Sequence, residues 1–144
     1  MSTKPVHLSL ATVLLSLGAV LQKYGTDHVY VNPAHKGTAP NDVGNGCEYK
    51  HADGSPGCIV GEVLTYNNVP LPNVGEPGAG SYAASLFEYL KDAGLVTTEP
   101  LAVALLSEIQ REQDKIREKE DDGSRFRCTW GEAVANGIKN TMAR

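Results

Sequence analysis

The stretch 47–58, CEYKHADGSPGC, gathers two of the chain's three cysteines and one of its four histidines around a short turn. Thiolates and imidazoles are zinc ligands, so Cys47, His51 and Cys58, with Cys128 as a fourth ligand, have the chemistry of a tetrahedral site. The spacing lacks the paired Cys-x2-Cys knuckles that are typical of structural zinc sites. A zinc-stabilised adaptor is therefore one alternative, and the sequence alone assigns no metal ligand.

The two cysteines of this stretch have two further interpretations. Cys47 and Cys58 flank a predicted junction between a strand and a helix, where two residues can lie within the ~5.5 Å Cα separation of a disulfide. An odd number of cysteines argues against a secreted disulfide framework, and a reducing compartment argues against a permanent bond. The simplest interpretation is a pair of small buried thiols, because free cysteine is among the most buried residue types.

A catalytic thiol is the remaining chemistry for this stretch. Cys58 falls in the first turn of a predicted helix, where the helix dipole lowers the pKa of a thiol, and His51 or His28 would be its base. The sequence offers no third residue to orient the base and no oxyanion hole. A thiol-dependent hydrolase or transferase centred on Cys58 is thus an alternative function, and no catalytic residue is assigned.

No other pattern in the chain indicates a cofactor. The glycines of residues 75–80 follow no predicted strand and do not lead into a Gly-Lys-Ser/Thr ending, which argues against a phosphate-binding loop. Neighbouring carboxylates such as Asp121 and Asp122 lie in a charged tract with no cleft to shift their pKa, so they are expected to be surface charge. We therefore expect no cofactor.

Two short segments are expected to form the ribbon that positions the cysteine and histidine cluster. Residues 28–33, HVYVNP, combine β-branched and aromatic residues before a proline, as a short strand does. Residues 47–51 alternate, which places Cys47, Tyr49 and His51 on one face. The economical pairing of these segments is a two-stranded antiparallel ribbon.

Apolar spacing and capping residues predict about five helices around this ribbon. In each case a Ser, Thr or Pro marks the beginning, and a glycine marks the end of two of them. The last helix begins with a capping box, in which the side chains of Thr129 and Glu132 satisfy each other's backbone N–H groups. The expected helices are Ser9 to Tyr24 before Gly25, Pro56 (capped by Ser55) to about Asn67, Tyr82 (capped by Ser81) to about Ala93 before Gly94, Glu99–Pro100 (capped by Thr97 or Thr98) onward, and Thr129 onward.

The fourth helix is predicted to be the longest and to have two different halves. Its first half, to Ile109, is apolar and should pack in the core. From Gln110 to Asp122 nearly every residue is charged or carries an amide, and charge neighbours four residues apart sustain an exposed helix. The second half is therefore expected to be solvated.

The overall composition predicts one globular domain over residues 1–144. The chain is 41% hydrophobic and 21% charged, and its length suffices to bury a core without disulfides or metal ions. The predicted fold class is mainly α (α+β), with about five helices and a short two-stranded antiparallel β-ribbon. A net charge of −4 argues against nucleic-acid binding, which needs concentrated lysine and arginine.

The N-terminal region contains an apolar run, Leu8 to Leu21, that loosely imitates a signal peptide. The run is too short to span a bilayer, and no typical cleavage site follows it. Its polar members, Ser9, Thr12 and Ser16 with Lys23, form one narrow stripe on a helix, which is typical of a mostly buried core helix. We therefore expect a cytoplasmic protein without membrane contact.

Several of these motifs occur together in a known group of sequences. The chain resembles small uncharacterised proteins of actinobacteria and their phages, in which a Tyr-Val-Tyr-like strand is followed by C-x-Y, P-x-C-[IVL]-[IV]-G-x-x-L, a glutamine-rich helix and W-x-x-A-V. The resemblance implies a phage or actinobacterial cytosolic setting and supplies no catalytic residue. Its matching motifs are Val29–Val31, Cys47-x-Tyr49, Pro56–Gly61 with Leu64, Gln110-x-x-Gln113-Asp114 and Trp130-Gly131-x-x-Val134.

Together these features predict a small non-enzymatic protein that is phage-encoded and acts by binding a host or phage protein. The expectation depends on the incomplete catalytic set, the acidic charge and the long loops. A protein partner is expected, and neither a nucleic acid nor a membrane. Homo-oligomerisation stays open at this point.

Overall fold

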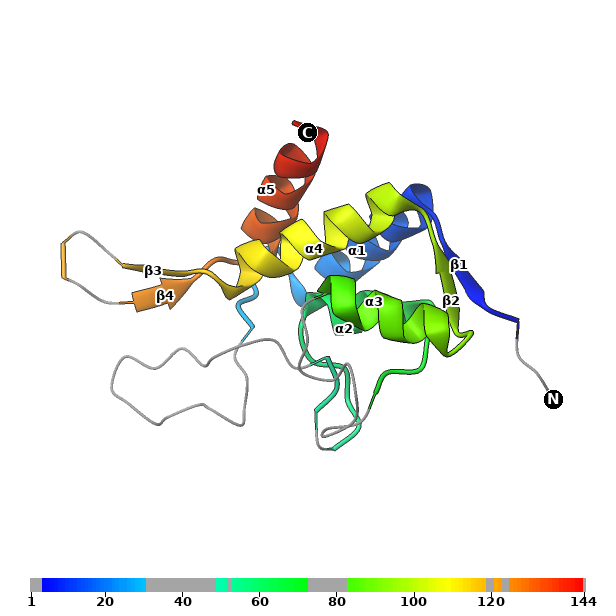
Figure 1. Cartoon of the computed structure of the whole chain (residues 1–144). Coiled ribbons are helices and arrows are strands. Elements are labelled where there is room, and N and C mark those ends of the chain that lie inside the picture. The colour runs from blue at the N-terminus through cyan, green and yellow to red at the C-terminus, as the bar shows by residue number, and fades with distance from the viewer. Residues whose placement is uncertain are drawn as a thin grey trace.

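The computed structural model describes residues 4–30, 49–51, 53–72, 83–118, 121–122 and 125–143. In this part of the chain it contains five helices and two small two-stranded sheets (Figure 1). The mainly helical class is confirmed. The elements are β1 (Val6–Leu8), α1 (Leu10–Tyr24), α2 (Ile59–Tyr66), α3 (Ala83–Asp92), β2 (Val96–Thr98), α4 (Pro100–Asp114), β3 (Ile116–Glu118), β4 (Arg125–Arg127) and α5 (Trp130–Met142).

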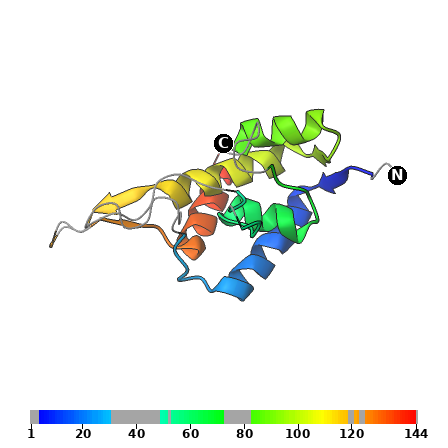
Figure 2. The same ribbon diagram turned by 90° about the horizontal axis from the view of Figure 1, so that it is seen from below.

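Helix α4 is the centre of the arrangement. Helices α2 and α3 both pack on it, α2 also packs on α1, and α5 runs along α4 over most of its length (Figure 2). α4 and α5 approach closely at Gly137, where a Cβ atom would lie 2.4 Å from Cγ1 of Ile109. Only a residue without a side chain fits there, so this glycine sets the distance between the two helices.

The predicted antiparallel ribbon of residues 28–33 and 47–51 is wrong, because the described strands pair in another way. β1 pairs with β2 in parallel, with Val6 opposite Val96 and Leu8 opposite Thr98. The described parts of the two predicted strands, 28–30 and 49–51, belong to no strand, and residues 31–48 lie outside the described residues. An antiparallel pair does occur elsewhere, between β3 and β4.

A local turn explains why residues 49–51 do not pair with the segment after α1. The carbonyl of Tyr49 accepts from Gly57 N at 2.9 Å, and His51 N donates to the carbonyl of Ser55 at 2.8 Å. Residues 49–51 thus pair back on the residues that follow the turn, with Lys50 opposite Pro56 in an isolated antiparallel bridge. The short loop closes at a lower entropic cost than a distant pairing.

The predicted caps of the first and last helices are confirmed. Ser9 Oγ accepts from Thr12 N at 3.0 Å at the beginning of α1, and Gly25 follows its end with a positive φ of 93°. Thr129 and Glu132 form both hydrogen bonds of the capping box of α5. These caps could be predicted because both partners are close in the sequence.

The N-cap residues of two other helices were predicted incorrectly, and so was the beginning of one of them. α2 begins at Ile59 rather than at Pro56, which is occupied by the bridge to Lys50, and its N-cap residue is Cys58, which makes no side-chain cap. α4 begins at Pro100 as expected, but Glu99 and not Thr97 or Thr98 is its N-cap. The Glu99 carboxylate instead accepts from Leu10 N at 2.6 Å, so it caps α1.

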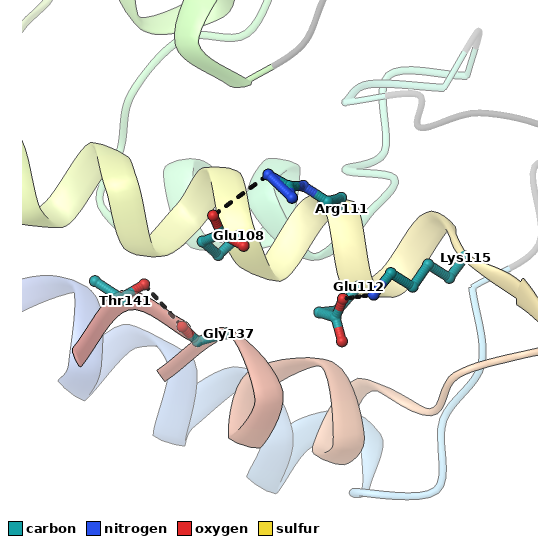
Figure 3. A network of polar contacts seen from close by, with 6 residues as sticks. All are labelled: Glu108, Arg111, Glu112, Lys115, Gly137 and Thr141. Atoms are coloured by element: carbon teal, nitrogen blue, oxygen red, sulfur yellow. Dashed lines mark hydrogen bonds and ion pairs between the residues drawn. The ribbon is translucent and has the colours of Figure 1, made fainter. Parts of the chain in front are cut away.

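The end of α4 also differs from the prediction. The helix ends at Asp114, and the chain continues into the β3–β4 hairpin instead of a solvated helix to Asp122. Within α4 the last turns are buried, because Gln110, Glu112 and Gln113 lie in the interior. Along this helix Glu108 pairs with Arg111 at 3.5 Å and Glu112 with Lys115 (Figure 3). The predicted solvated half is therefore wrong as a helix to Asp122 and wrong for these three buried side chains, whereas Arg111, Lys115, Asp121 and Asp122 are exposed.

The apolar run Leu8 to Leu21 forms part of β1 and most of α1. Val13, Leu17 and Val20 of this helix are buried in the core, together with Ser16 of its polar stripe. In the described part of the chain, no helix combines the length and apolar character needed to cross a bilayer.

Candidate functional site

The residues of the cysteine and histidine cluster have separate environments. Cys58 is 0% exposed and takes part in a disulfide. Cys128 is buried and forms no disulfide, and Cys47 lies outside the described residues. In this state the Cys58 sulfur is neither a nucleophile nor a thiolate ligand, because its electron pair is shared in the S–S bond and water does not reach it.

His51 is oriented by an aromatic neighbour rather than by a cysteine. Its ring stacks on Tyr30 with centroids 5.9 Å apart and an interplanar angle of 6°. Among the described residues, no group of three or more His, Cys, Asp and Glu side chains could hold a metal ion. The zinc alternative needs Cys58 in its reduced form and also includes Cys47, which lies outside the described residues, so it stays a prediction.

The site with the most distinctive chemistry is an open cleft of about 340 Å³. This volume is at the lower end of the ~300–1,000 Å³ that is typical of small-molecule sites. The cleft lies where the end of α1, the segment after it, the 49–57 turn, α2 and the beginning of α5 meet. Its walls are mostly rings, and its lining residues are Tyr24, His28, Val29, Tyr30, His51, Pro56, Gly57, Glu62 and Trp130.

Glu62 is the acidic group of this cleft. It stands on α2 and is only 5% exposed, although it is a lining residue. The Tyr24 hydroxyl donates a hydrogen bond to Glu62 Oε1. Burial, this hydrogen bond and the negative charge of Glu62 together raise the pKa of Tyr24 to about 12. The phenol therefore stays a donor at neutral pH.

His28 completes a cluster of three rings beside the carboxylate. Its centroid lies 4.4 Å from that of Trp130 and 5.1 Å from that of Tyr24, and Trp130 and Tyr24 meet edge to face at 5.2 Å. Burial lowers the pKa of His28, and the charge of Glu62 opposes this shift only in part. The imidazole is therefore neutral at pH 7.

Backbone contacts hold this ring cluster at the beginning of α5. Trp130 N donates to the carbonyl of His28 at 2.7 Å, and Gly131 N donates to the carbonyl of Thr26 at 2.9 Å. A Cβ atom at Gly131 would lie 2.8 Å from the Thr26 carbonyl oxygen. The segment after α1 therefore satisfies the first N–H groups of α5 and fixes the position of the indole ring.

A buried glutamine of α4 holds two of the elements that border the cleft. Gln113 Oε1 accepts from Ile59 N and from Trp130 Nε1, both at 3.0 Å. Ile59 N is the first N–H of α2, the helix that carries Glu62, so the amide replaces the cap that Cys58 does not supply. One side chain of α4 thus fixes both the helix and the indole that border the cleft.

Gln110 has the same role one turn earlier on α4. Its Oε1 accepts from Ala83 N at 2.7 Å, at the beginning of α3, and its Nε2 donates to the Tyr49 hydroxyl at 2.8 Å. Burial raises the pKa of Tyr49, which keeps this phenol neutral. The glutamine pair of the sequence motif therefore positions two helices.

Sequence reasoning missed Glu62, Tyr24 and Trp130 as site residues. The signal that was available is the position of Glu62, a charged residue between the buried Gly61 and Val63 on an otherwise apolar short helix. A carboxylate at such a position is buried only when it has a polar partner or a role.

No protein-family model, curated protein or solved structure matches the chain.

Proposed function

We propose that this protein is phage-encoded, that it acts by binding a host or phage protein, and that the cleft between α1, α2 and α5 belongs to the contact surface. The observation that supports the proposal is the cleft itself, an open depression with walls of tyrosine, histidine and tryptophan rings. Tyr and Trp are enriched among the residues that contribute most to protein–protein affinity.

The fixed positions of the side chains in the cleft also favour binding. The rings of Tyr24, His28 and Trp130 pack on one another, and backbone hydrogen bonds hold two of these residues. Side chains that are ordered before association lose little entropy when a partner arrives. The cleft is therefore a preorganised surface.

The polar groups of the cleft support binding more than covalent catalysis. Among the described lining residues there is no serine, threonine, lysine or cysteine, and the Glu62 carboxylate is buried and accepts the Tyr24 hydroxyl. The alternative of a thiol-dependent hydrolase centred on Cys58 gains no support, because that sulfur is buried and already bonded.

The proposal is tested with one variant in the cleft and a matched control outside it. Val29 lines the cleft and is 36% exposed, and Leu15 on α1 is 75% exposed and is not a lining residue. The intact protein is used to capture partners from an actinobacterial lysate, with and without phage infection, and the captured protein is then purified and titrated by calorimetry.

We expect V29R to weaken saturable binding by roughly tenfold or more, because the long arginine side chain obstructs the cleft and replaces an apolar contact. L15R should bind like the wild type. The proposal is rejected if no partner binds saturably, or if V29R binds as tightly as L15R.

A further inference from the structure

The cleft contains a buried carboxylate that faces no cation in the part of the chain that the structure describes. Glu62 is 5% exposed, and among the described residues its contact is one hydrogen bond, from the Tyr24 hydroxyl to Oε1. No lysine, arginine or histidine nitrogen of the described residues lies within ion-pair distance of this carboxylate. A charge in this position is destabilising until a cation or further donors reach it.

The neighbouring side chains do not supply the missing positive charge. The Tyr24 phenol is neutral at pH 7, and the His28 imidazole is also neutral because burial outweighs the effect of Glu62 on its pKa. Lys23 is the nearest described cation on α1, but its ammonium lies over the Tyr24 ring, 5.1 Å from the centroid. The described part of the cleft thus holds an acidic side chain and no cationic partner for it.

The aromatic walls of the cleft also attract cations. The faces of tyrosine and tryptophan rings attract ammonium and guanidinium groups within about 6 Å of the centroid. Tyr24, Tyr30 and Trp130 all line the cleft that contains Glu62. The position of Lys23 over Tyr24 is one instance of this attraction within the chain itself.

We propose that the cleft binds a basic side chain of the partner protein, with the Glu62 carboxylate as its counter-ion and the rings of Tyr24, Tyr30 and Trp130 around the charged group. This inference depends on the proposed function, since it names the part of the partner that the cleft receives. The cleft volume of about 340 Å³ suits one long side chain. The open mouth allows the rest of the partner to remain on the surface.

The chain contains its own reporter for this experiment. Trp130 is the single tryptophan of the protein, and it lines the cleft. The probes are the peptides acetyl-Gly-Arg-Gly-amide and acetyl-Gly-Lys-Gly-amide, with acetyl-Gly-citrulline-Gly-amide as an uncharged control that has nearly the shape of arginine. Binding is followed by tryptophan fluorescence and by amide chemical-shift changes of the full chain.

The variants separate the charge of Glu62 from its role in folding. E62Q keeps a carbonyl acceptor for Tyr24 and removes the charge. E108Q is the matched control, because Glu108 on α4 is equally buried, at 5% exposed, and lies outside the cleft. Thermal unfolding by circular dichroism verifies that both variants are folded.

We expect a basic peptide to bind the wild type and E108Q, and to bind E62Q roughly tenfold or more weakly, because the charge-assisted contact is lost. The citrulline peptide should bind wild type as weakly as the arginine peptide binds E62Q. Equal binding of the arginine and citrulline peptides would overturn the proposal, as would the absence of shifts at the cleft with both basic peptides.

The partner captured in the previous experiment distinguishes this inference from the proposed function. If the whole partner binds E62Q as tightly as the wild type, the cation site is rejected and protein binding is retained. If basic peptides bind but no partner protein is captured, the cation site is retained and the proposed function is rejected.

Discussion

Replacing Gln113 with leucine removes one acceptor from the interior and leaves two donors without a partner. Gln113 is 0% exposed, and its Oε1 accepts from Ile59 N and from Trp130 Nε1. Both donors are in the interior, where water cannot replace the lost acceptor. Leucine is similar in size to glutamine, so the change tests the hydrogen bonds more than the packing.

The expected loss of stability follows from the number of unsatisfied donors. Each buried donor without a partner costs about 1–3 kcal/mol, so the two N–H groups together cost about 2–6 kcal/mol. A domain of ordinary stability unfolds with a free energy of about 5–15 kcal/mol. Q113L is therefore expected to lose a large fraction of the total stability.

The measurement is urea denaturation followed by far-ultraviolet circular dichroism. A second background, W130F, lacks the indole donor, so Q113L leaves only Ile59 N without an acceptor there. The cost of Q113L in that background should be smaller by about 1–3 kcal/mol. Q22L, at an exposed position of α1, is the control, with an expected change within about 0.5 kcal/mol.

A Q113L variant that loses less than about 0.5 kcal/mol, the range of ordinary surface substitutions, would contradict this double role of Gln113. An equal cost in both backgrounds would contradict it as well. Either result would mean that the amide does not cap α2 and hold the indole at the same time.

Two further predictions concern helix packing and pH. G137A should lose about 1–3 kcal/mol in the same denaturation assay, because its Cβ would meet Ile109 Cγ1 at 2.4 Å. G18A, where a Cβ meets nothing within 4 Å, should instead gain about 0.5–1 kcal/mol of helix stability. Stability should fall as the pH drops through 6.5 and below, because the pKa of His28 is lower in the folded chain and the unfolded chain binds more protons there. The H28N variant should have a flatter stability curve between about pH 7 and 5, and an unchanged slope would contradict the assignment.

The elements that could be predicted are those in which both partners are local. Ser9 caps the nearby Thr12 N, and the Thr129 and Glu132 pair closes within one turn of α5. The apolar faces of α2 and α3 were likewise predicted from spacing, and Leu86, Phe87 and Leu90 of α3 are buried.

The cleft could not be predicted because its residues come from distant segments. Tyr24, Glu62 and Trp130 are separated by dozens of positions, and no spacing rule connects them. The local pattern around the cysteines predicted a ribbon in the wrong place, since residues 49–51 pair with the residues just after the turn. The polar tail of α4 was misinterpreted for a related reason, because amide side chains are buried when their partners are backbone groups of other helices.

The presence of five helices, most of their apolar faces and the capping box of α5 follow from the local sequence, because period and capping depend on residues within one or two turns of each other. The parallel pairing of β1 with β2 and the burial of Gln110 and Gln113 arise only when the helices pack. The same packing also decides the position of the Glu62 carboxylate among aromatic rings. These features depend on contacts between residues far apart in the chain, whose free energy is gained only when the helices pack together.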